Sequence, residues 1–259
     1  VPGEHCFPVI GRANVVSAFV NFSAINPADY GKTVFTGYAA MTDTGKVLNV
    51  VEAGDELLVI TDRTPFYAAS GGQIGDHGVI RGKGAEFTVH TTDKVEDVFI
   101  HRGVWAGAGR FGKGDQVELH VDIASRRATM RNHTATHLLH KALQELLGGH
   151  VKQAGSAVDP DRLRFDFTHF QSIDPTTLGA IEQRVNDRVL ESLPVNTVET
   201  SYDEAVKLGA MALFGEKYGD VVRLVRVGDY SKELCGGTHI SNSSEIGMFA
   251  ILGESSIAS

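Results

Sequence analysis

Residues 129–149, TMRNHTATHLLHKALQELLGG, constrain the architecture of this chain more than any other stretch. The side chains that recur at the three- and four-residue spacing of one helix face are Thr136, Leu139, Leu143, Leu146 and Leu147. The two glycines that follow are typical of a helix end. The stretch therefore predicts a helix over residues 129–147.

Two histidines of this stretch share one face of the predicted helix. His133 and His137 are four positions apart, so both rings can reach one ion. About a hundred residues later, the run CGGTH again separates two metal-ligating residues, Cys235 and His239, by four positions. Three imidazoles and a thiolate suit zinc. We therefore expect one Zn²⁺ ion bound by His133, His137, Cys235 and His239; the alternative is a buried histidine pair beside an unrelated glycine turn.

The number of ligands leaves the role of the expected ion open. Four protein ligands close a tetrahedral site, as in structural zinc centres, whereas catalytic zinc keeps one position free. Either all four residues bind in the resting state, or one stands back for water or substrate.

Composition limits the classes of protein to consider. A chain of 259 residues with 42% apolar residues can form two modest domains or one large one. It has no apolar run near the roughly 18–20 residues of a membrane span and no signal-peptide pattern, so we expect no membrane association. Two cysteines do not make a disulfide framework, and a reducing, cytoplasmic location is the simpler expectation.

The net charge of −8 argues against a broad basic face for nucleic acid, although a specific contact remains open. Arg126, Arg127 and Arg131 form a local basic run that could contact phosphate. The interpretation that we prefer is a solvated face at a joint between domains.

The pattern of short elements changes near residues 125–129. Before it, β-rich runs separated by glycine turns are typical of a small barrel or sandwich: 34–36, 46–51, 56–60, 78–80, 86–89 and 117–121. After it, helices and strands alternate, which predicts an α+β layer with strands at 164–167, 195–200, 221–227 and 249–252 and helices at 175–193 and 202–208. We predict an unassigned segment 1–32, with a possible strand at 15–20 and a turn at Asn26-Pro27, then a barrel domain 33–128 and a zinc-containing domain 129–259.

Two further clusters carry polar groups suited to binding. Gln153 and Ser156 follow the first predicted helix, where an amide and a hydroxyl could hold a carbonyl or a substrate hydroxyl; an ordinary polar strand face is the alternative. Residues 70–73, SGGQ, contain two glycines that permit close approach of a ligand, or form a plain turn. The sequence has no glycine-rich nucleotide motif, so we expect no nucleotide cofactor.

Several longer runs resemble one family. The chain is similar, over about residues 33–259, to the editing region of alanyl-tRNA synthetases and to their free-standing relatives, the AlaX proteins. The runs that carry the resemblance are 35–38 (FTGY), 62–67 (DRTPFY), 70–73 (SGGQ), 132–140 (NHTATHLLH), 164–167 (RFDF), 209–219 (GAMALFGEKYG) and 233–239 (ELCGGTH).

The resemblance implies a fold and an activity. The fold is α+β: a small β-barrel followed by a two-layer editing domain of the alanyl/threonyl-tRNA synthetase type. The activity is hydrolysis of serine or glycine from mischarged tRNA(Ala), with the two metal motifs as zinc ligands. The implied catalytic residues are Gln153 and Cys235. The expected substrate- or tRNA-binding residues are Ser70, Gly71, Gly72, Gln73, Thr134, Ser156 and Gly237.

The expected partners are the 3′ end of tRNA(Ala) carrying a wrong amino acid and the other domains of a parent synthetase. A free-standing editing factor and a non-catalytic, zinc-stabilised tRNA-binding module remain as alternatives. A zinc peptidase is disfavoured, because HxxxH lacks the glutamate that serves as general base in HExxH.

Overall fold

The computed structural model describes residues 4–6, 22, 25–211 and 219–257, and the chain forms two compact units. The barrel unit comprises Ala13–Ser70 and Ile74–Arg126. The α+β unit comprises Val1–Arg12, Gly71–Gln73 and Arg127–Ser259. Three residues, Gly71–Gln73, thus belong to the α+β unit although barrel residues flank them in the sequence.

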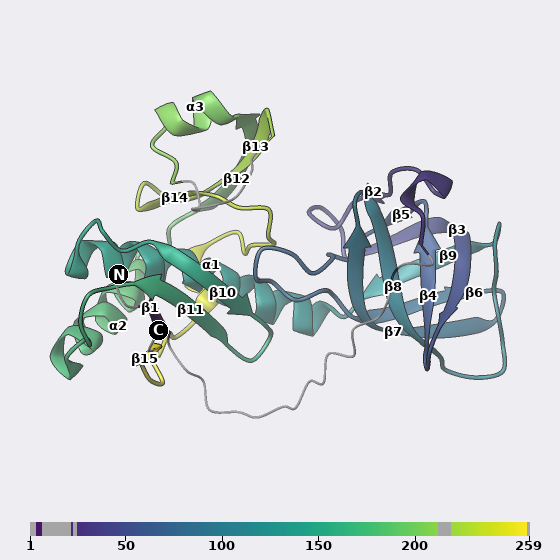
Figure 1. The fold of residues 1–259 in the computed structure, drawn as a ribbon, viewed down its shortest axis with the longest axis horizontal. Helices are drawn as coiled ribbons and strands as arrows, with labels where there is room; N and C mark the ends of the chain where they lie inside the picture. The colour runs from purple at the N-terminus through teal and green to yellow at the C-terminus, as the bar shows by residue number, and fades with distance from the viewer. Residues whose placement is uncertain (1–3, 7–21, 23–24, 212–218, 258–259) are drawn as a thin grey trace. The chain divides into compact units, whose positions relative to one another are not determined.

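The barrel unit is a closed barrel of six strands (Figure 1). Every neighbouring pair is antiparallel, and the first and last strands pair to close the barrel. The strands in spatial order are β3 (Thr42–Ala53), β4 (Glu56–Thr61), β8 (Val98–Trp105), β7 (Ala85–Val95), β6 (Gly78–Gly82) and β9 (Gln116–Val121). The short parallel pair β2 (Val34–Phe35) and β5 (Arg63–Thr64) and a 3₁₀ turn, η2 (Pro27–Asp29), complete the unit, so the predicted small barrel is confirmed.

Strand β8 is absent from the sequence predictions, and its residues show why. His101, Arg102 and Gly103 interrupt the apolar pattern that identifies a strand. His101 is nevertheless fully buried, because both of its ring nitrogens have partners inside the barrel. At Gly103 a Cβ atom would lie 1.8 Å from the carbonyl oxygen of Thr88, so the barrel excludes a side chain there.

Two helices and a four-stranded sheet form the main layer pair of the α+β unit. Helix α1 (Ile123–Leu147), whose first turn lies in the barrel unit, and helix α2 (Pro175–Leu190) share one apolar core with the sheet. The sheet order is β10 (Gln153–Val158), β11 (Leu163–Thr168), β1 (Glu4–Cys6) and β15 (Ser255–Ile257), and Figure 1 shows the β10–β11 hairpin beside α1. Core side chains come from α1, α2 and β11: Leu138, Leu139, Ile181, Val185, Phe165 and Phe167.

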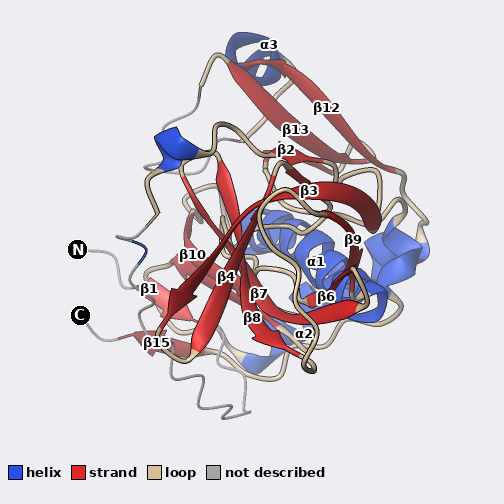
Figure 2. Ribbon diagram, turned by 90° about the vertical axis from the view of Figure 1, so that its right-hand side faces the viewer, coloured by secondary structure: helices blue, strands red, loops and turns tan. Residues whose placement is uncertain are grey.

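A second, antiparallel sheet positions the later metal motif. Its order is β12 (Val195–Ser201), β13 (Val221–Val227) and β14 (Ser231–Leu234). Helix α3 (Tyr202–Lys207) packs at the end of the β12–β13 pair (Figure 2), and η3 (Ser243–Ile246) follows the motif. Because β14 ends at Leu234, Cys235 is the first residue of the loop that leaves the sheet.

Three sequence predictions need correction. Helix α1 begins at Ile123 rather than at residue 129, because the Asp122 carboxylate accepts a hydrogen bond from the Ser125 N–H at 2.9 Å and starts the helix earlier. Arg126 does not lie on a solvated face: it is 1% exposed and pairs with Asp76.

The third correction is that residues 249–252 form no strand. Side chains of α2 bind their backbone instead: Asn186 exchanges hydrogen bonds with the N–H and C=O of Phe249, and Glu182 accepts from the N–H of Ile251. The possible strand at 15–20 and residues 212–218 of the GAMALFGEKYG run lie outside the described residues. The predicted strands at 164–167, 195–200 and 221–227 and both later helices are confirmed.

Candidate metal centre

The two metal motifs meet within the α+β unit. The rings of His133 and His137 stack on one face of α1, with centroids 5.5 Å apart and planes at 10°. The loop after β14 brings Cys235 and His239 to the same point. One ligand atom from each of these four residues lies within 4.8 Å of the other three, so this group could hold a metal ion.

A glutamine sets the tautomer of His133. The Oε1 atom of Gln73 accepts a hydrogen bond from the Thr238 N–H at 2.9 Å, which identifies it as the oxygen of the amide. His133 Nδ1, 2.8 Å from the same oxygen, must therefore carry the proton. The lone pair of the ring then lies on Nε2, which is 3.4 Å from Cys235 Sγ.

The other two histidines, His137 and His239, also have a hydrogen-bond acceptor at Nδ1. The Glu233 carboxylate can only accept, so His137 Nδ1 donates to it at 2.8 Å. The Thr134 hydroxyl donates to the Met130 carbonyl at 3.0 Å and therefore accepts from His239 Nδ1 at 3.1 Å.

The ligand atoms left by this arrangement fit a zinc ion. The Nε2 atoms of His137 and His239 are buried, and within the described residues they have no hydrogen-bond partner. Such orphaned buried nitrogens are rare unless something else binds them. Three imidazole lone pairs and one sulfur directed at a common point are a typical zinc donor set, with the second ring nitrogens held by neighbouring acceptors.

Charges around the cluster favour the thiolate. Burial alone would raise the pKa of Cys235, but its interactions with the neighbouring His133 and His137 hold that pKa well below its usual range. Burial likewise opposes ionisation of Glu233, yet His137 and His140 hold its pKa below the ordinary value. Burial would lower the pKa of His137, but the negative charges of Glu233 and Cys235 raise it to about 10, so a metal ion at Nε2 would have to displace a proton from this ring. Thiolate is the form of cysteine that binds metals.

Two residues that sequence reasoning missed shape the loop after β14. The Arg223 guanidinium donates to the carbonyl oxygen of Cys235 at 3.1 Å and to that of Gly237, and its own carbonyl accepts from the Cys235 N–H. The Glu233 carboxylate, 2% exposed, joins His137 to His140. An arginine in an apolar strand and a glutamate two residues before a cysteine give no sequence signal of these contacts.

The two polar clusters expected from the sequence lie side by side along β10. The carbonyl of Gly72 accepts from the Val158 N–H at 2.8 Å, and a Cβ on Gly72 would lie 2.3 Å from Ser156 Oγ. That hydroxyl accepts a hydrogen bond from Gln153 Nε2 at 3.2 Å. The segment 71–73 therefore connects Gln153 and Ser156 with the ligand set, through Gln73.

The remaining predicted binding residues fall into two groups. Ser70 and Gly71 are exposed. Thr134 and Gly237 are buried against the ligands: Thr134 bonds to His239, and a Cβ on Gly237 would lie 2.0 Å from His133 Cε1. Their contact with substrate or tRNA stays a prediction.

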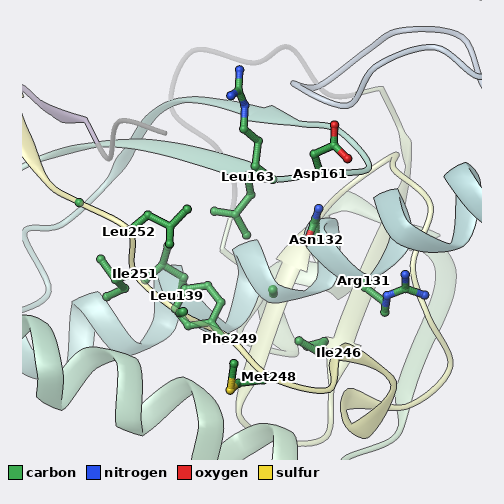
Figure 3. A pocket seen from close by; sticks show the side chains of 14 residues that line it. Arg131, Asn132, Leu139, Asp161, Leu163, Ile246, Met248, Phe249, Ile251 and Leu252 are labelled. Carbon is green, nitrogen blue, oxygen red and sulfur yellow. The ribbon is translucent and has the colours of Figure 1, made fainter. Parts of the chain in front are cut away.

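A cavity of about 270 Å³ lies on another face of α1 (Figure 3). Arg131, Asn132 and Leu139 of α1 line it, together with Leu163 of β11 and the segment 246–253. None of the four clustered ligands is among its lining residues. This cavity is therefore separate from the metal centre.

Comparison with known proteins identifies the class of the chain. Residues 13–125 match the family described as tRNA synthetases class II (A), and residues 222–259 match the threonyl and alanyl tRNA synthetase second additional domain. The chain is thus related to class II aminoacyl-tRNA synthetases.

Alanine–tRNA ligases of several bacteria are close relatives of the chain. That of Pelotomaculum thermopropionicum is 53% identical over 88% of this chain and 27% of its own length. The ligase of Thermoanaerobacter sp. is 52% identical over 87% of this chain and 27% of its own length. The ligase of Halorhodospira halophila is 49% identical over 89% of this chain and 28% of its own length. The chain spans about a quarter of these relatives, and it belongs with the editing region of alanyl-tRNA synthetases, as its motifs predict. Among the described residues, no helix is both long and apolar enough to cross a membrane.

Proposed function

We propose that the α+β unit hydrolyses the ester that joins a wrong amino acid, serine or glycine, to the 3′ end of tRNA(Ala). The relationship to alanyl-tRNA synthetases supports an editing role. The observation that carries the proposal is the convergence of four ligand atoms, which the segment Gly71–Gln73 connects with the polar pair Gln153 and Ser156. Such a unit would act within a larger synthetase in the cytoplasm.

The cluster also has a buried and an accessible side. His133 and His137, on α1, are buried, whereas Cys235 and His239 are only half-buried. Gly236, between them in the sequence, is exposed. An aminoacyl ester would therefore approach from the side of the 235–239 loop.

His133, His137, Cys235 and His239 would hold a single Zn²⁺ ion. Bound there, the ion would act as a Lewis acid or as a template that orients the aminoacyl group.

Polar groups of the chain would supply selectivity. The Gln153 amide and the Ser156 hydroxyl can hold the ester carbonyl or the hydroxyl of a seryl group. A site built to bind a hydroxyl disfavours alanine, because its polar groups would be left unpaired. Glycine would have to be selected differently, by space too small for a methyl group.

A non-catalytic, zinc-stabilised tRNA-binding module is the second candidate function. Four protein ligands within 4.8 Å of one another can close a tetrahedral shell, which is typical of structural zinc. The two functions differ in whether the zinc-loaded chain releases amino acid.

Deacylation of Ser-tRNA(Ala) and Gly-tRNA(Ala) by the 259-residue chain tests both candidates. We expect Cys235→Ala and Gln153→Ala to reduce the rate by about 10²–10³-fold, the usual effect of removing a group that stabilises the transition state. Gln183→Ala is the matched control, since Gln183 bonds to Asp187 on the exposed face of α2. Wild-type rates in both variants would contradict the catalytic assignment, and zinc binding without hydrolysis would support the non-catalytic module.

A further inference from the structure

The three acceptors that orient the histidine ligands have different origins. Thr134 lies on α1 and Glu233 on β14, the elements that also carry or precede the ligands. Gln73 instead comes from a three-residue segment flanked in sequence by barrel residues. We propose that Gln73 is a positioning residue that fixes the ligand tautomer of His133 and holds the two metal motifs together.

The hydrogen bonds of Gln73 join both motifs. Its Oε1 accepts from His133 Nδ1 on α1 and from the Thr238 N–H in the 235–239 loop. Its Nε2 donates to Thr238 Oγ1 at 2.9 Å. The side chain is 2% exposed, so water cannot readily replace these partners.

The backbone of the segment aims Gln73 at His133. Gly71 and Gly72 have φ values of 58° and 82°, a left-handed conformation that favours glycine. Gly72 lies against Ser156, and Gln73 forms a parallel bridge with Val158 of β10. The segment is thus held by β10 independently of its glutamine side chain.

Loss of the Gln73 acceptor would leave a buried donor on His133 unpaired. His133 is 4% exposed, and the alternative tautomer would place its proton on Nε2, the atom that faces Cys235. A protonated Nε2 cannot ligate a metal. Removing such a supporting contact typically weakens metal binding by about 10–100-fold.

Zinc affinity of the complete 259-residue chain, measured by competition with a chromophoric chelator, tests the proposal. Gln73→Met keeps the length of the side chain but removes the amide, and we expect it to bind zinc about 10–100-fold more weakly. Gln73→Glu restores an acceptor for His133 and Thr238 and should stay within about threefold of wild type. Gln183→Ala is the control for loss of a glutamine elsewhere in the unit.

A spectroscopic measurement examines the tautomer without any variant. In ¹⁵N spectra of the zinc-loaded wild type, we expect the proton of His133 on Nδ1. A proton on Nε2 would overturn the proposal, as would Gln73→Met within threefold of wild type or Gln73→Glu as weak as Gln73→Met.

The inference depends on metal binding, which the proposed function shares, and not on hydrolysis. A wild-type chain that binds no zinc would overturn the metal assignment and this proposal together. Zinc binding that is insensitive to Gln73 would overturn this proposal alone.

Discussion

Each unit of the molecule contains buried histidines, and the two sets differ in how many ring nitrogens have a hydrogen-bond partner. In the barrel unit, His101 has two partners: its Nε2 lies 2.7 Å from Thr64 Oγ1 and its Nδ1 lies 2.9 Å from the Val59 carbonyl oxygen. In the α+β unit, His137 and His239 each have a partner at Nδ1 and, among the described residues, none at a buried Nε2.

This difference separates a structural histidine from a ligand. A buried histidine with both nitrogens paired satisfies its own polar groups and contributes to the fold. Several histidines whose unpaired nitrogens converge beside a thiol are instead the arrangement expected of a metal site. The burial of a histidine alone would not distinguish His101 from His137.

The largest expected effect concerns a second buried network of the barrel unit, in which Arg126 has partners for its polar groups. The Arg126 guanidinium donates to both carboxylate oxygens of Asp76 and to the carbonyls of Gly37 and Pro65. Asp76→Ala leaves this buried charge unpaired, so we expect a loss of about 3–5 kcal/mol in the free energy of unfolding.

Urea unfolding followed by fluorescence of Trp105, the single tryptophan, measures the effect in the barrel. Asp97→Ala, which breaks an exposed pair with Lys32, should cost less than about 1 kcal/mol. Equal costs for the two variants would contradict the view that the Arg126 network is closed by Asp76.

A pH effect of intermediate size distinguishes His101 from the ligands. Burial lowers the pKa of His101 to about 4, although its bond to Val59 opposes the shift. Between about pH 6.5 and 4 the unfolded state therefore binds a proton that the folded barrel does not. Barrel stability should be complete above about pH 6.5 and fall by about 3 kcal/mol as the pH approaches 4.

Urea unfolding monitored by Trp105 at several pH values tests this expectation. His101→Gln should flatten the pH dependence in this window more than His90→Gln does, since the latter removes only an exposed ring that pairs with Glu56. A slope that persists in His101→Gln would show that other groups cause it.

The smallest expected effect concerns the packing of Gly237 against His133, one of the four clustered ligands. Gly237→Ala would place a Cβ 2.0 Å from His133 Cε1 and 3.0 Å from Gln73 Oε1. We expect a cost of about 1–3 kcal/mol and zinc binding weakened by about 10–100-fold, because the ring must move.

Gly236→Ala is the matched control, since a Cβ there has no atom within 4 Å. Its stability should change by less than about 0.5 kcal/mol. Thermal unfolding and chelator competition report both quantities. Similar results for the two glycines would argue against close packing of His133 on Gly237.

The spacing of residues along the sequence was enough to predict a helix face and the class of the first domain. The four-residue spacing of His133 and His137 correctly placed both rings on one helix face, and glycine turns between short strands correctly indicated a barrel. Strand β8 is not predictable from its sequence, because the buried His101 and the following Arg102 and Gly103 interrupt its apolar pattern. The expected strand at 249–252 failed because Asn186 and Glu182 of α2, rather than another strand, bind that backbone.

The surroundings of the ligands depend on contacts between residues far apart in the sequence. The glycines of the run SGGQ predict close approach of a substrate or of tRNA, but they do not indicate that the Gln73 side chain lies against His133. Nothing within residues 70–73 indicates which distant residue the glutamine meets. The same holds for Arg223, whose contacts follow from the pairing of β13 with β14.

The α+β unit is built from separate stretches of the sequence, and this affects the order in which its parts can assemble on the ribosome. Gln73 is made 60 residues before His133 and 165 residues before Thr238, and it must wait for both. The barrel strands end at Val121, so the barrel can close while the later ligands are still untranslated. Gly71–Gln73 would then remain a loop without partners until His133 and Val158 emerge, and Gln73 would complete its hydrogen bonds only with Thr238. A gene fragment that starts at residue 127 would never supply the three residues Gly71–Gln73.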